Sequence, residues 1–103
     1  MNTQMIIKEL RTGLASHFNS KDDFVFIFGS RANGKAKPNS DWDIGVIGKK
    51  QIPGSALEKA RESLEEIRTL QTFELVDFQK VPDSFKKIAM KEIIPLIGKL
   101  VTE

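Results

Sequence analysis

The sequence predicts an α+β fold in which helices flank a small mixed β-sheet. Some segments repeat apolar residues every three or four positions, as one face of an amphipathic helix requires, and others are short aromatic and β-branched runs typical of strands. These segments follow one another as helix, strand, strand, helix, strand, helix. With 103 residues the chain can bury one core but has no room for a second substrate-binding domain, so residues 1–103 are expected to form one domain.

The N-terminal part is expected to begin with an amphipathic helix over about residues 2–18. Its apolar side chains recur at every fourth position: Ile6, Leu10, Leu14 and Phe18. The continuous aromatic and β-branched run Phe24–Phe28 then predicts a strand that is buried on both faces. Residues 30–36 are compatible with one or two helical turns or with an irregular loop, and Pro38 ends that segment.

The second strand is expected to begin at Ser40 and to carry acidic residues on one face only. Because side chains alternate between the two faces of a strand, Asp41 and Asp43 point to the same side. Apolar side chains share the other side: Trp42, Ile44 and Val46. Trp42 is therefore expected in the core rather than beside a ligand.

The C-terminal part is expected to contain a helix, a strand and a last helix. Ser55 and Glu58 form a capping-box pattern at the start of an amphipathic helix. A strand is predicted over residues 72–79, and its alternation gives two mixed faces. One face carries Phe73, Leu75 and Asp77, and the other carries Glu74, Val76 and Phe78. The last helix, over about residues 83–92, should end or kink at Pro95. Apolar residues follow it: Ile97, Leu100 and Val101.

The two acidic residues of the second strand define a candidate metal site. Asp41 and Asp43 repel each other unless a divalent cation lies between them. Mg²⁺ favours one or two carboxylates together with substrate phosphates and water. A pair of such ions promotes in-line displacement at a phosphorus atom. These residues therefore predict that the protein binds a nucleotide.

The loop after the first strand supplies candidate nucleotide-binding residues. Gly29 lets the backbone approach a phosphate because it has no Cβ, and the hydroxyl of Ser30 can bond phosphate oxygens. Arg31 and Lys35 are candidates to neutralise the remaining charge. The segment from Gly29 to Lys35 also partly matches a P-loop, but Ala36 stands where a P-loop needs Ser or Thr. A P-loop is therefore not expected.

Composition excludes several other kinds of site. The chain has no cysteine, which excludes disulfides, thiolate catalysis and cysteine-based zinc sites. No apolar run reaches the length of a membrane span and the N-terminus lacks a signal-like core, so we expect a cytoplasmic protein. The net charge of +2 comes from Lys and Arg spread among nearly as many Asp and Glu, so direct nucleic-acid binding is not expected.

The spacing of the glycine turn and the acidic pair carries a resemblance to a known family. Gly29 and Ser30 are followed, after ten residues, by the Asp-x-Asp pair Asp41 and Asp43. This pattern resembles the signature of the DNA polymerase beta-like nucleotidyltransferase superfamily, and within it the minimal nucleotidyltransferases. The resemblance implies a nucleotidyltransferase fold, ATP as the nucleotide donor and two Mg²⁺ ions. It also implies a third carboxylate on a later strand, where Asp77 is similar in position and would serve as metal ligand and proton acceptor.

The resemblance further implies a biological role. Minimal nucleotidyltransferases of this size are often paired with HEPN-domain ribonucleases in toxin–antitoxin modules, where they act as antitoxins by modifying a tyrosine of the partner. The expected reaction is thus transfer of AMP to a hydroxyl of a partner macromolecule. Three alternatives stay open: a non-catalytic module that masks a partner, a nucleic-acid-directed transferase, and an Asp77 that is merely a strand-end residue bonded by backbone amides.

Overall fold

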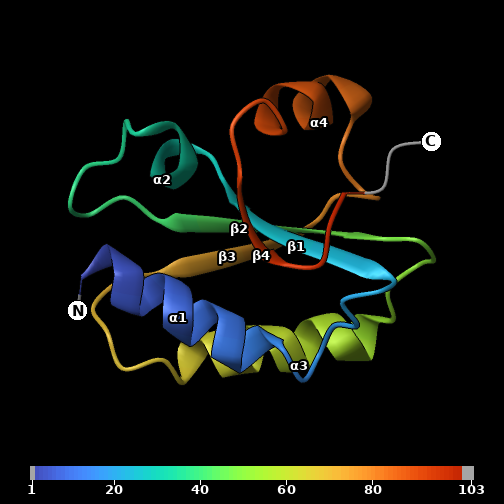
Figure 1. Ribbon diagram of the computed structural model, residues 1–103, viewed down its shortest axis with the longest axis horizontal. Helices are drawn as coiled ribbons and strands as arrows, with labels where there is room; N and C mark the ends of the chain where they lie inside the picture. Colours follow the sequence, from blue (N-terminus) through green and yellow to red (C-terminus); the bar gives the residue numbers. More distant parts are fainter. Residues whose placement is uncertain (1, 101–103) are drawn as a thin grey trace.

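Four strands form one mixed sheet that is covered by helices on both faces (Figure 1). The computed structural model describes residues 2–100. Its elements are α1 (Thr3–Leu14), β1 (Asp23–Phe28), α2 (Ser30–Asn33), β2 (Trp42–Gly48), α3 (Gly54–Glu65), β3 (Phe73–Asp77), α4 (Asp83–Ala89) and β4 (Ile94–Ile97). The predicted α+β class with a small mixed sheet is confirmed.

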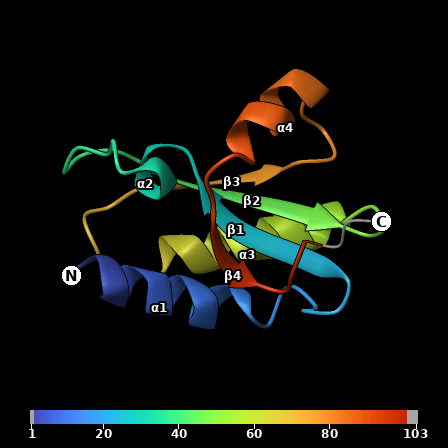
Figure 2. The ribbon, with the colours of Figure 1, turned by 45° about the horizontal axis from the view of Figure 1, so that its top comes forward.

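The order of the strands across the sheet is β3-β2-β1-β4. β1 runs antiparallel to both β2 and β4, whereas β2 and β3 are parallel. The helices α1 and α3 cover one face, and α2 and α4 lie over the other (Figure 1 and Figure 2). The parallel pair matters most for function, because parallel strands start at the same edge of a sheet and bring their first residues together.

The core divides into two clusters, one on each face of the sheet. The larger cluster joins β1 and β2 to α1 and α3, and it includes Trp42, which is 1% exposed. The smaller one is aromatic and contains Phe24, Phe26, Phe28 and Phe78. The rings of Phe26 and Phe78 meet edge to face with centroids 5.0 Å apart, an arrangement that aromatic pairs prefer. β1 is thus buried on both faces, as its sequence predicts.

Two helices differ at their ends from the prediction. α1 ends at Leu14 rather than at Phe18, although Phe18 is still buried against the core. α3 begins at Gly54, and its N-cap is Pro53, whose carbonyl accepts the first backbone bonds of the helix. Ser55 therefore lies inside the first turn and not at the cap. The predicted capping box is wrong, because no side chain bonds the start of α3.

The last part of the chain forms a strand where the sequence pattern favoured only a helix and an apolar tail. α4 ends at Ala89, and Ile94–Ile97 pairs with β1 as β4. Pro95 lies within this strand, opposite Phe26, next to an irregularity in the ladder. A strand at the edge of a sheet tolerates proline because half of its backbone N–H groups need no strand partner. Val101 lies outside the described residues, and no helix in the range 2–100 has the length and hydropathy to cross a membrane.

Candidate active site

Asp43 lies beside the glycine turn that follows β1. In the β1–β2 ladder Asp43 is opposite Phe28, so Gly29 comes directly after that pair. Gly29 has a φ of +72° and a ψ of −153°, a combination that is essentially restricted to glycine. A Cβ at this position would lie 2.5 Å from Oδ2 of Asp43. The absence of a side chain at Gly29 therefore leaves the space that the Asp43 carboxylate occupies.

The half-buried carboxyl group of Asp43 lies among other negative charges. Burial raises the pKa of Asp43, and the carboxylates of Glu74 and Asp41 raise it further. All three influences disfavour the ionised form of Asp43. A cation placed among these groups would reverse that effect.

Asp41 directly precedes β2 and is exposed. Its Oδ1 accepts a hydrogen bond from the hydroxyl of Thr72, the residue before β3. The backbone continues the same pairing, since the amide of Trp42 donates to the carbonyl of Thr72 at 2.9 Å. The starts of β2 and β3 are therefore held side by side at one end of the sheet. This end carries Asp41, Asp43 and Glu74 and is called the acidic edge below.

The prediction that Asp77 joins this site is wrong. In the parallel ladder Asp43 is opposite Glu74, whereas Asp77 is opposite Val46, three residues further along. That offset amounts to about 10 Å along a strand, and an odd number of steps also turns the side chain to the other face. Asp77 therefore lies on the face that α1 and α3 cover, away from Asp43.

The surroundings of Asp77 match the alternative that the sequence left open. Asp77 is 5% exposed, and its Oδ1 accepts the backbone N–H of Gln79 at 3.0 Å. Its Oδ2 is buried and has no hydrogen-bond partner among the described residues. Asp77 therefore has a structural role, in which its side chain bonds the backbone just after the end of β3.

Glu74 is the acidic residue that sequence reasoning missed. It is exposed, lies opposite Asp43 on the same face, and contributes to the raised pKa of Asp43. A signal was present in the sequence, because the acidic pair stands at the beginning of its strand and Glu74 stands at the beginning of the next one. Using that signal required knowing that β2 and β3 are parallel.

The two basic residues of the loop differ in their surroundings. The guanidinium of Arg31 donates to the carbonyl of Ser40 at 2.7 Å and to Oε1 of Gln71 at 2.8 Å. It also lies 4.8 Å from the centre of the Trp42 ring, as a cation–π pair. Arg31 therefore holds the loop against the sheet, and its bonds do not go to the carboxylates. Lys35 is exposed in the same loop.

A cleft of about 590 Å³ opens from the acidic edge toward α4. Asp43, Glu74 and Gly29 line it together with apolar residues, and Asn33, Lys91 and Glu92 complete the polar part of the lining. The apolar part includes Phe28 and Val76 of the sheet and, from α4, Phe85, Ile88 and Ala89. The cleft thus combines anionic oxygens with an apolar wall, which is the combination expected of a small-molecule site.

The family follows from comparison with known proteins. The family model described as polymerase beta, nucleotidyltransferase matches residues 13–99. The chain belongs to this nucleotidyltransferase family. The nucleotidyltransferase is 31% identical over 78 residues to a probable protein adenylyltransferase MntA of Haemophilus influenzae, and the match covers 76% of this chain and 68% of the relative. The fold and the enzyme class predicted from the sequence are confirmed.

Solved structures share the fold of this nucleotidyltransferase. A chain from a toxin–antitoxin crystal structure with AMP-PNP superposes with a TM-score of 0.69 at 20% identity, covering 90% of this chain and 73% of that one. A chain from a complex of tri-AMPylated Shewanella oneidensis HEPN toxin with MNT antitoxin gives a TM-score of 0.66 at 18% identity, covering 93% and 72%. At these identities the likeness concerns the fold.

The acidic edge of the nucleotidyltransferase fits a hard divalent cation. Its oxygen donors are carboxylates, and the pKa of Asp43 is raised first by burial and then by the negative charges of Glu74 and Asp41. Within residues 2–100, no three acidic side chains are arranged to hold a metal ion by themselves. Mg²⁺ does not require such a cage, because it usually keeps water and phosphate oxygens as its remaining ligands.

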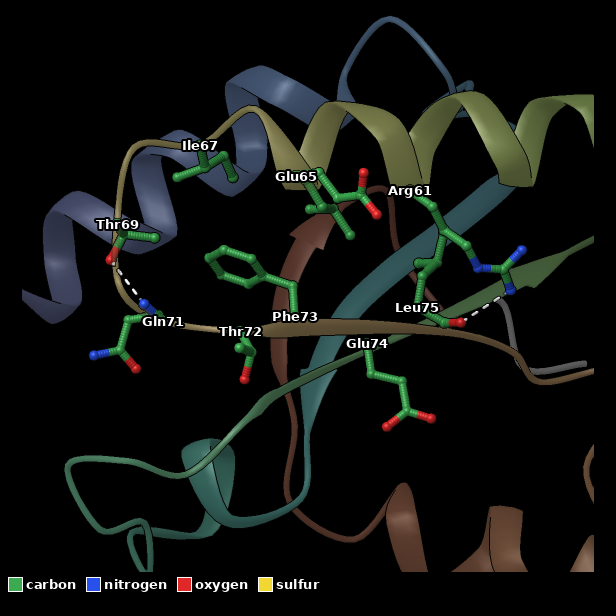
Figure 3. A pocket seen from close by; sticks show the side chains of 10 residues that line it. Arg61, Glu65, Ile67, Thr69, Gln71, Thr72, Phe73, Glu74 and Leu75 are labelled. Carbon is green, nitrogen blue, oxygen red and sulfur yellow. Dashed lines mark hydrogen bonds between the residues drawn. The ribbon is translucent and has the colours of Figure 1, made fainter.

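A second cavity, of about 530 Å³, lies along the outer edge of β3 (Figure 3). It is bounded by residues near the end of α3 and by the segment that leads into β3. Glu74 lines this cavity as well as the cleft beside α4. The nucleotidyltransferase therefore has two cavities that meet at one exposed carboxylate.

Proposed function

We propose that this nucleotidyltransferase transfers AMP from ATP to a hydroxyl of a partner protein, and that the partner is a HEPN-domain toxin. The observation that carries the proposal is the pairing of Asp43 with Glu74 beside the Gly29 turn. The relative named as a probable protein adenylyltransferase supports AMP as the transferred group. The structural neighbour that contains an AMPylated HEPN toxin and an MNT antitoxin supports the partner and an antitoxin role.

The donor nucleotide is assigned to the cleft beside α4. The triphosphate lies at the Gly29 turn, where the backbone is accessible and Ser30 follows with its hydroxyl. The adenosine extends toward the apolar wall, where Phe85 offers an aromatic face to the base. Two exposed lysines are available to the phosphates: Lys91, which lines the cleft, and Lys35 in the loop. Arg31 acts indirectly by fixing the loop.

The reaction is a displacement at the α-phosphorus. The acceptor oxygen forms a bond to this phosphorus, the bond from phosphorus to the pyrophosphate oxygen breaks, and pyrophosphate leaves. Glu74 takes the proton of the acceptor hydroxyl, because it is the exposed carboxylate where the two cavities meet. Mg²⁺ ions held by Asp41, Asp43 and Glu74 would neutralise the charge of the triphosphate and of the pyrophosphate.

The proposal is tested by measuring transfer of labelled AMP from ATP to the HEPN-domain partner, with variants of three acidic residues compared. We expect Glu74→Gln to lower the transfer rate by about 100-fold or more, the range for losing a general base and metal ligand. Asp43→Ala should lower it at least as much. Asp77→Asn should keep most of the activity, because Asp77 lies on the opposite face of the sheet.

Two outcomes would contradict the proposal. If Asp77→Asn abolished transfer while Glu74→Gln did not, the assignment of the third carboxylate would fail. If the Asp43→Ala chain neutralised the partner as completely as the parent chain, without any transferred label, the protein would be a non-catalytic module that masks its partner. Circular dichroism of each variant verifies that the fold is intact.

A further inference from the structure

The second cavity forms a groove along the outer edge of β3, called the β3-edge groove below. It is lined by consecutive residues, from Gln71 through Leu75, whose side chains point alternately to the two faces of the sheet. Figure 3 shows Phe73 directed toward α3 and Thr72 and Glu74 directed away from it. A cavity that touches both sets must run along the outer edge of the strand, where a further strand would lie.

The backbone of β3 offers bonding groups toward this groove. The carbonyl of Thr72 and the N–H of Phe78 bond to β2, so the even-numbered residues between them face β2 in the parallel ladder. Phe73 and Leu75 therefore direct their N–H and C=O groups outward. In the sheet formed by the described residues β3 is an edge strand, so these groups have no strand partner. Arg61 bonds the outward carbonyl of Leu75 at 3.1 Å.

The groove reaches Glu74 along β3, whereas the donor cleft opens toward α4. Glu74 belongs to both cavities, and Thr72, which lines the groove, bonds Asp41. In-line displacement requires the attacking oxygen and the departing pyrophosphate on opposite sides of the phosphorus. With the nucleotide in the cleft beside α4, a hydroxyl that arrives along β3 would reach the carboxylates from a different direction.

We propose that the β3-edge groove docks the acceptor: an extended segment of the partner protein adds to β3 as a strand and presents its hydroxyl at Glu74. This inference rests on the proposed function. The segment carries a hydroxyl at one end and, beyond it, an apolar side chain that packs on Ile67 and the half-buried Phe73. Main-chain bonds to Phe73 and Leu75 supply affinity, and the side-chain contacts supply specificity. Arg61 exchanges its bond to Leu75 for the incoming backbone.

A bulky substitution in the groove tests the docking. Glu65 is an exposed residue of α3 that lines the groove, and Figure 3 shows its side chain between α3 and β3. Glu65→Trp should lower AMP transfer to the HEPN-domain partner by about tenfold or more, because it occupies the path of an added strand. Its affinity for AMP-PNP, measured by calorimetry, should stay at the parent value.

Glu62→Trp is the matched control. Glu62 is also an exposed residue of the same helix, and it does not line the groove. This variant should transfer AMP at the parent rate. Equal rates for Glu65→Trp and Glu62→Trp would overturn the docking proposal. A loss of AMP-PNP affinity in Glu65→Trp would also overturn it, since the groove would then serve the donor.

Hydrogen exchange separates docking from chemistry. The Asp43→Ala chain is mixed with the HEPN-domain partner, and amide exchange is followed by mass spectrometry. Protection of the Phe73 and Leu75 amides, lost in an Asp43→Ala, Glu65→Trp double variant, supports the groove even if the parent chain transfers no AMP. The docking proposal would be overturned if the partner left exchange at these amides unchanged. It would also be overturned if exchange slowed with protein concentration alone, as binding of a second copy of this chain would cause.

Discussion

At the scale of the residue, the site depends on a glycine whose conformation other residues rarely adopt. Gly29 combines a positive φ with contact to the Asp43 carboxylate, so both its backbone and its missing side chain are used. A Cβ added there would meet Oδ2 of Asp43 at 2.5 Å. A side chain at position 29 would therefore cause both backbone strain and steric overlap, and the overlap would be with the carboxylate of Asp43, the proposed metal ligand.

Gly29→Ala should lower the free energy of unfolding by about 1–3 kcal/mol, the cost of a backbone conformation that is nearly restricted to glycine. It should also abolish AMP transfer, because Asp43 has to move. Chemical denaturation and the transfer assay measure the two effects. Gly34→Ala is the control: Gly34 has a φ of +80°, but a Cβ added to it would meet no atom within 4 Å, so this variant should be strained yet active. Loss of activity in both variants would contradict the inference that Gly29 is required because of its contact with Asp43.

At the scale of the element, sequence patterns located most helices and strands but not their partners. The alternation within β3 separated Glu74 from Asp77, yet only the pairing with β2 decides which of them meets Asp43. Both faces of β3 mix apolar and acidic residues, so its sequence alone specifies weakly which face turns toward the core. The pairing with β2 sets that orientation. The same limit applies to β4, whose short apolar sequence with Pro95 becomes a strand through its pairing with β1.

α4 is the element for which the nucleotide proposal predicts a binding effect. Phe85 on α4 is 43% exposed although it is aromatic and lines the cleft. Phe85→Ala should weaken AMP-PNP binding by about tenfold, within the 1–3 kcal/mol found for a base stacked on an aromatic ring. Leu70→Ala removes another exposed apolar side chain that does not line the cleft and should leave the affinity unchanged. Isothermal titration calorimetry compares them, and equal affinities would place the base elsewhere.

At the scale of the whole molecule, the sheet lies between the larger part of the apolar core and the acidic site. The larger apolar cluster lies on the face of α1 and α3, and the acidic residues of the site lie on the other face and at its edge. The acidic pair, its spacing from the glycine turn and the fold class were predictable, because they depend on local sequence. The third carboxylate was not, since it depends on the relation between two strands that are distant in sequence.

The charge gathered on one face should make stability depend on pH. Burial and the charges of Glu74 and Asp41 raise the pKa of Asp43, so the folded chain holds this proton to higher pH than the unfolded chain does. The favourable contribution is complete below the ordinary carboxyl pKa and is lost as the pH rises through the raised value. The melting temperature of Asp43→Asn, relative to the parent, should therefore increase between about pH 3 and pH 8 without Mg²⁺.

Mg²⁺ provides the complementary measurement. At about pH 8 it should raise the melting temperature of the parent chain more than that of Asp43→Asn, because an ion that binds only the folded state stabilises it. Calorimetry over the pH series gives both comparisons. A difference between the two chains that does not change with pH would contradict the raised pKa as the cause.

The position of β4 has a consequence for synthesis. β1 lies in the middle of the sheet, but one of its two neighbours, Ile94–Ile97, comes from a distant part of the sequence, so this pairing forms only after the intervening chain has been made. While the ribosome is still adding those residues, an apolar strand has one open side. A nascent chain stalled before Ile94 would be a target for chaperones and for self-association, and the addition of β4 closes the open side.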